Sequence, residues 1–384
     1  MRTLLLLALA LLQVLLLAGK GGVRANYREI EQLLVIQTMG LDDTGAGVTL
    51  SLAAAGDSER GPRRLRAEGM TISGAMEHIY RYSFEEELFC AHVDRLLIGE
   101  KAAENGLEST LAYLTRAPEM RLDMPLYIVR DGTALDTLMN AGGSKGICEV
   151  MDTVELSAKR RGDSGVTTAA GVLRDSARFG SALVCALSCD RASELEGPPD
   201  GSGGESDSLS VAPAGYAILR EGRLCRYLTP EQSVAAGLLK NETGLCELEL
   251  RDGRGATAVL EITGGGSSLQ PVWDGPGQLR GLRIGAEVRA TLAEVHGRPG
   301  PQDAAYADGL TARLEARLSE LLTETMQASR DLKADFLGLA AQVERASPGA
   351  FRQLDRAFPE LLPELELEIS VSARLSHTND RRES

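Results

Sequence analysis

Hydrophobic and polar residues alternate along the chain in short segments, and the spacing within these segments predicts a mixture of strands and helices. Residues 31–40 form a β-rich run, Asp42 and Asp43 follow as an expected turn, and residues 47–53 alternate behind it, so together they predict a hairpin. Helical spacing over residues 71–82 begins behind a capping threonine. Before this helix, residues 56–66 predict a loop. After it, we expect a strand at 89–98, helices at 101–105 and 109–116, and a strand at 125–130.

The second half begins with a segment that has almost no apolar residues. Residues 194–210 are crowded with glycine, proline, serine and acids, which predicts a linker. Short strand-like runs follow at 216–219, 223–227, 246–250 and 256–263, separated by glycine-containing turns, and they predict a small sheet. The tract at 264–268 lacks the lysine and the helix of a phosphate-binding loop, so we interpret it as a turn.

The strongest helical signal covers residues 304–345. Leucines recur there at steps of three and four residues, and a break at 329–335 is expected because one straight helix of this length would reach about 60 Å. Residues 365–375 alternate perfectly, as in a half-buried strand. We predict a multidomain α+β fold with small mixed sheets. Its expected parts are a signal peptide at 1–25, an N-terminal domain at 26–193, a linker at 194–212, a small β-rich middle domain at 213–273 and a C-terminal α+β domain at 274–384.

The first residues indicate export. Arg2 precedes an apolar run at 4–18 that is interrupted only by Gln13, and such a run reaches about 22 Å as a helix, short of the ~30 Å hydrocarbon core. We therefore expect a signal peptide that is cleaved after Ala25, with an uncleaved anchor as the alternative.

Composition and charge narrow the classes of partner. The chain has 55 acidic and 41 basic residues, a net charge of −14 and a pI near 5.0, so it repels a phosphate backbone and nucleic acid is not expected as a partner. Six cysteines permit disulfides, but an extended strand would hold Cys185 and Cys189 about 13 Å apart, beyond disulfide reach. We expect buried free thiols and neither metal nor cofactor, since the four histidines form no ligand-spaced cluster with them.

Motifs that would indicate catalysis are missing from the sequence. It has no nucleophile elbow, zinc-binding helix motif, Walker loop or dinucleotide fingerprint. His92 and Glu100 form the best local acid–base pair, yet eight residues of strand and turn separate them. We predict a protein that is not an enzyme.

Several segments together resemble a known family. They are residues 67–76, 88–107, 111–116 and 125–130, with 28–30 and 39–42 before them and 215–219, 333–338 and 365–375 after them. In order and spacing they are similar to the Ger(x)C family of spore germination proteins, the C subunits of germinant receptors. The resemblance covers nearly the whole chain after residue 25.

The resemblance implies a non-enzymatic lipoprotein of three α+β domains on the outer face of the spore inner membrane. It also implies two integral-membrane partner subunits and a response to nutrient germinants. Lys20 stands where the family has its lipidated cysteine, so a diacylglycerol anchor is not expected.

At the family-matching positions His92, Glu100, Arg116 and Asp335 we expect structural roles. Glu100 and Arg116 are expected to form an ion pair within the first domain, with a partner-contacting surface as the alternative, and Asp335 is expected to cap the second half of the long helix. An exported solute-binding protein is the alternative function, and an exported hydrolase is a third. The sequence specifies neither the germinant nor the stoichiometry.

Overall fold

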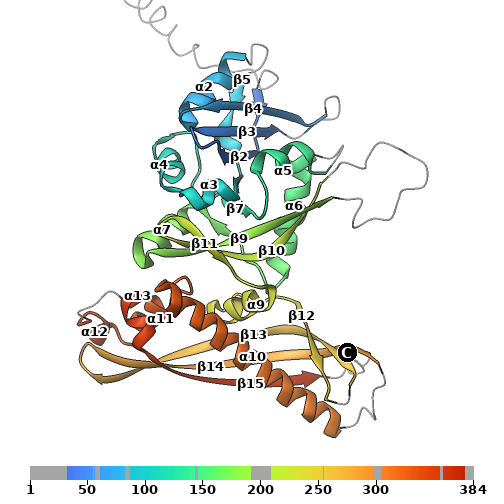
Figure 1. Cartoon of the computed structure of the whole chain (residues 1–384), viewed down its shortest axis with the longest axis vertical. Coiled ribbons are helices and arrows are strands. Elements are labelled where there is room, and N and C mark those ends of the chain that lie inside the picture. Colours follow the sequence, from blue (N-terminus) through green and yellow to red (C-terminus); the bar gives the residue numbers. More distant parts are fainter. Residues whose placement is uncertain are drawn as a thin grey trace, which may run out of the picture.

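The computed structural model describes residues 33–54, 56, 61–82, 87–142, 146–191, 209–253, 255–297, 304–354 and 358–376. The expected signal peptide, Lys20 and most of the expected linker lie outside these residues. The described chain is α+β and contains sheets of two, nine and four strands, stacked along the long axis of the molecule (Figure 1). The expected fold class is confirmed, although the largest sheet is wider than the small sheets that we predicted.

The nine-stranded sheet organises the first half of the chain. Its strand order among the described residues is β11-β10-β9-β7-β6-β2-β3-β4, and β8 pairs with β7 off this path. The central strands β2, β6, β7 and β9 are parallel to one another, whereas β3, β4, β10 and β11 are antiparallel to their neighbours. The strands are β2 (Thr38–Asp43), β3 (Val48–Ala54), β4 (Arg63–Gly69), β6 (Arg95–Gly99), β7 (Pro125–Val129), β8 (Thr167–Thr168), β9 (Ser181–Arg191), β10 (Leu209–Arg220) and β11 (Arg223–Tyr227); the short strands β1 (Leu33–Val35) and β5 (Glu87–Phe89) pair separately.

Helices cover both faces of this sheet, which is why its central strands are apolar throughout. Successive side chains of β6 point to opposite faces of the sheet: Leu96 enters one core cluster and Leu97 enters another. One face packs against α2 (Ile72–Tyr82), α3 (Glu100–Asn105), α4 (Glu108–Arg116) and α7 (Ala169–Phe179), and the other against α5 (Ala134–Asn140) and α6 (Gly146–Arg160). The short 3-10 helix η3 (Cys90–His92) precedes β6.

The four-stranded sheet belongs to the second half of the chain. Its order is β12 (Cys246–Arg251), β13 (Thr257–Gly275), β14 (Gln278–His296) and β15 (Glu366–Ser376), and α10 (Ala304–Leu332) runs diagonally across it (Figure 1). The leucine stripe of α10 is buried against the sheet, so it forms core, as apolar stripes commonly do. The remaining elements are α9 (Pro230–Lys240), α11 (Leu339–Ala346), α12 (Pro348–Phe351), α13 (Phe358–Leu361) and the 3-10 helix η4 (Leu362–Glu364).

One core cluster joins the two large sheets. Leu183 and Ile218 of the nine-stranded sheet belong to the same cluster as Leu260 and Leu314 of the C-terminal half. The helix α9 lies between the sheets and is buried along most of its length, which agrees with this continuity (Figure 1).

The strand pairing corrects the expected division of the chain. β10 and β11 pair with β9 in the first sheet, so they do not belong to a middle domain at 213–273. The expected linker at 194–212 lies between two neighbouring antiparallel strands, and its residues 209–212 are part of β10. The expected boundary at 273/274 falls within β13, near the turn to β14.

Two local expectations were also wrong. The tract at 264–268 is not a turn, because it continues β13 and pairs with β14 through a register shift at Ile262 and Gly264. A Cβ on Gly265 would stand 2.7 Å from the Glu287 carbonyl oxygen, so glycine permits the strands to approach there. The expected loop at 56–66 contains the start of β4, whose arginines conceal a strand pattern.

Other expectations are confirmed. The predicted hairpin, α2, α3, α4 and β7 occur, and the long helix breaks after Leu332. Asp42 and Asp43 do not form the expected turn, because β2 continues through Asp43 and both residues pair with β3. The cysteines of the described chain are free, and four are buried, but Cys225 is exposed and Cys189 is half-buried.

Candidate interaction surface

Glu100 and Arg116 do not form the ion pair that we expected. Within the described residues, the Glu100 carboxylate accepts a hydrogen bond from the Asp131 backbone N–H, at 2.8 Å. Burial and this carboxylate raise the pKa of Tyr227. Arg116 is exposed at the last position of α4. Glu100 therefore fixes a turn in which Asp131 has a positive φ of 54°, and Arg116 is left to solvent.

His92 is a surface residue. It is exposed in η3, and its ring lies 5.4 Å from the Phe89 ring. No hydrogen bond or ion pair joins it to Glu100 in the described part of the chain, so the two do not form an acid–base pair there.

Asp42, at the end of β2, has a buried carboxylate that holds the start of α5 in place. The two Asp42 oxygens accept hydrogen bonds from the backbone N–H groups of Ala134 (2.8 Å) and Leu135 (2.7 Å) at the start of α5. A Cβ on Gly99 would stand 1.9 Å from Asp42 Oδ1, so only glycine fits at the neighbouring strand end. Burial raises the pKa of Asp42. This family-matching segment has a structural role.

Asp335 is the cap of α11. Its oxygens accept hydrogen bonds from the backbone N–H groups of Leu339 (2.7 Å) and Ala340 (2.8 Å), and the residue is 0% exposed. Burial raises the pKa of Asp335 to about 7, although the two backbone hydrogen bonds oppose that shift. It connects the break after α10 to the next helix and touches no open cavity among those described.

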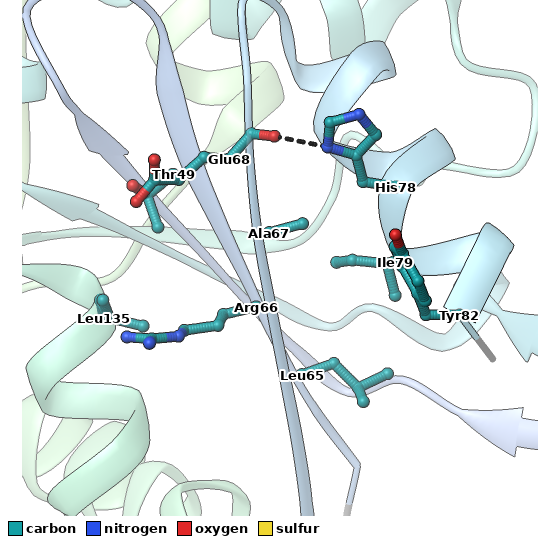
Figure 2. A pocket seen from close by; sticks show the side chains of 9 residues that line it. All are labelled: Thr49, Leu65, Arg66, Ala67, Glu68, His78, Ile79, Tyr82 and Leu135. Carbon is teal, nitrogen blue, oxygen red and sulfur yellow. Dashed lines mark hydrogen bonds between the residues drawn. The ribbon is translucent and has the colours of Figure 1, made fainter.

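A hollow of about 500 Å³ lies along the outer edge of the nine-stranded sheet. Figure 2 shows Thr49, Arg66 and Leu135 on one side of β4 and His78, Ile79 and Tyr82 of α2 on the other. The hollow thus has lining from both faces of the sheet, which places it at the strand edge. His78 Nδ1 lies 2.9 Å from the Glu68 carbonyl oxygen; because a carbonyl only accepts, Nδ1 carries the proton.

A second hollow of about 450 Å³ brings together two of the family-matching segments. Met70 and Ile72 come from the first segment and Tyr113 and Arg116 from the third, at one end of α2 beside α4. Met70 is 79% exposed, and Tyr82 at the other end of α2 is 78% exposed. Exposed large apolar side chains beside a hollow are typical of a surface that binds another protein.

The described residues contain neither a metal-binding cluster nor a membrane-spanning helix. No cluster of three or more histidine, cysteine or acidic residues with metal-binding geometry occurs among them. Among the helices in the described ranges, none has both the length and the apolar character of a membrane span.

Sequence reasoning overlooked the β4 edge. The alternation of Leu65 and Ala67 with Arg66 and Glu68 was a usable signal, because the first pair turns toward α2 and the second toward the other face. Three arginines in four residues outweighed that alternation and suggested a loop.

Comparison with known proteins assigns the family. A family model described as "Spore germination protein N-terminal domain" matches residues 26–157, and one described as "Spore germination B3/ GerAC like, C-terminal" matches residues 214–379. No curated protein matches the chain. The crystal structure of the GerBC protein has a similar fold, with a TM-score of 0.54 and 13% identity over 88% of this chain and 96% of that one. Because the two family models follow each other in order and cover most of the chain, the protein belongs to the Ger(x)C family of spore germination proteins.

Proposed function

We propose that the protein is the non-enzymatic C subunit of a spore germinant receptor and that it acts with two integral-membrane subunits when nutrients trigger germination. The observation that carries this proposal is the match of both family models, in order, to one chain. The similar fold of the GerBC protein agrees with it. The exposed Met70 and Tyr82 beside hollows support a role in binding.

Deletion of the gene tests this function. Spores of the deletion strain should germinate more slowly with particular nutrients, while growth and sporulation stay normal. Genes for two membrane subunits should lie beside this gene, whereas a permease and an ATPase would indicate a solute-binding protein. Normal germination with every nutrient, in a strain without a second receptor, would contradict the proposal.

We further propose that the chain is exported and is held at the outer face of the spore inner membrane by its partner subunits. A lipoprotein thioether needs a cysteine thiol, and Lys20 has none. The apolar run at 4–18 is short for a stable span. Cleavage after Ala25 would leave protein contacts as the attachment.

Mass spectrometry of the mature N-terminus tests the attachment. A chain that starts at Asn26 is the expected result, and an intact Met1 would indicate an uncleaved anchor instead. An acylated N-terminus would overturn the argument from Lys20.

A further inference from the structure

The strand β4 is a long and regular sheet edge. Among the described residues it pairs with β3 alone, through seven consecutive residue pairs without a register shift. At about 3.3 Å per residue its edge extends roughly 23 Å. An edge of this length offers a row of backbone groups to another strand unless the protein covers or distorts it.

The backbone of Arg66 faces outward from this edge. The Glu68 carbonyl points away from β3, because it accepts a hydrogen bond from His78 of α2. In an antiparallel ladder, residues two apart direct their N–H and C=O groups to the same side. Arg66 therefore directs its backbone N–H and C=O outward, as Glu68 does. In the described chain, no side chain of a helix is hydrogen-bonded to these two groups. His78 thus occupies the outward backbone carbonyl of Glu68, whereas the outward backbone groups of Arg66 remain available to another strand.

The Arg66 side chain is also available. Its guanidinium is exposed, and no hydrogen bond or ion pair joins it to another described residue. Figure 2 shows it extended toward Leu135 on one side of β4, while Ile79 and Tyr82 form the wall on the other. A strand that lay along β4 would meet backbone groups at the centre of the hollow, one cation on one face and apolar side chains on both.

The charge of the edge selects the occupant. The cation that faces the hollow at the centre of this edge is the exposed Arg66 guanidinium, in a chain whose net charge is −14. Two copies of β4 that paired at their centres would bring their two Arg66 side chains together, and this like-charge contact disfavours a second copy. An acidic segment is attracted to the same edge.

We propose that β4 is a strand-addition site that binds an extended acidic segment of a partner protein, with Arg66 at its centre. The segment would become a further strand of the sheet in the hollow between α2 and α5. Backbone hydrogen bonds would hold it, and the Arg66 guanidinium would pair with a carboxylate. This assignment stands on the edge geometry and does not depend on the receptor proposal.

A labelled peptide can test the site directly. The probe is a capped seven-residue peptide of alternating valine and glutamate, and its binding to the full chain is followed by fluorescence anisotropy at low salt. We expect saturable binding that becomes at least ten-fold weaker with Arg66→Glu. The matched control is Arg283→Glu, which makes the same charge change at an exposed strand arginine of the other sheet and should leave binding unchanged. Thermal melting of both variants checks that they fold.

Two further peptides separate strand addition from simple charge attraction. A peptide with every amide N-methylated keeps its carboxylates but cannot pair with a strand, so we expect it not to bind. A peptide with lysine in place of glutamate should bind only to the Arg66→Glu variant. Equal binding of the methylated peptide, or no saturable binding of the acidic one, would overturn the proposal. A dimer that Arg66→Glu dissociates would show that the occupant is a second copy and would overturn the choice of partner.

Discussion

Replacement of Asp335 by asparagine should remove a pH dependence from the stability of the protein. The carboxylate is 0% exposed and accepts two backbone hydrogen bonds at the start of α11. Asparagine retains nearly the same shape and one acceptor oxygen, but it does not titrate. The substitution therefore separates the ionisation of this group from its packing.

The sign and size of the effect follow from the raised pKa. Burial raises the pKa of Asp335 from 3.8 to about 7. Between these values the unfolded chain has lost the proton while the folded chain keeps it, so the group's contribution to stability is complete below pH 3.8 and is lost as pH rises through 7. This rise in the pKa of Asp335 corresponds to a loss of about 4 kcal/mol in the free energy of unfolding.

Urea unfolding at pH 4 to 8 measures this contribution. The wild type should be more stable than Asp335→Asn at pH 4, and its advantage should shrink steadily up to pH 7 and then stay constant. Asp331→Asn is the matched control, because it makes the same substitution at an exposed carboxylate near the end of α10 and leaves Asp335 in place, so the loss of stability due to Asp335 should persist. Parallel curves for the wild type and Asp335→Asn would refute the reasoning.

Two glycine positions yield further predictions, each measured by thermal unfolding. Gly99→Ala should cost about 1–3 kcal/mol or more, because its Cβ would overlap Asp42 Oδ1, which two backbone N–H groups hold in place; an unchanged melting temperature would contradict this packing. Gly265→Ala should also cost about 1–3 kcal/mol, because its Cβ would meet the Glu287 carbonyl at the adjacent strand. Gly285→Ala is the control on the same sheet, because its Cβ would meet only flexible serine hydroxyls, at 3.3 Å or more. We expect this control to change stability by about 0.5 kcal/mol. Equal losses for Gly265→Ala and Gly285→Ala would count against the argument.

Elements with a clear hydrophobic period were predictable, because burial of one face determines which of their positions are apolar. α2 buries Ile72, Ala75, Met76 and Ile79 at helical spacing, and β15 alternates along its whole length. The break after Leu332 was also predictable, since a helix of ~60 Å exceeds the size of such a domain.

The partition into sheets was not predictable from local patterns. β9 and β10 are neighbours although a polar segment separates them, and nothing in that segment indicates that its two ends return to the same sheet. Composition marked residues 194–210 as a linker, but a polar connection between two strands of one sheet has the same composition. The glycine tract of β13 predicts a turn by its composition, and its close approach to β14 is visible only in three dimensions.

Three acidic residues within the segments that carry the family resemblance hold the backbone. Asp42, Glu100 and Asp335 each accept hydrogen bonds from backbone N–H groups, at a helix start or at a turn. A carboxylate used in this way supports the fold of this chain, whatever the protein binds. Such positions identify the fold of the family and leave its binding surface unspecified. A residue like Arg66, which the described fold does not use, is therefore the better place to look for a partner.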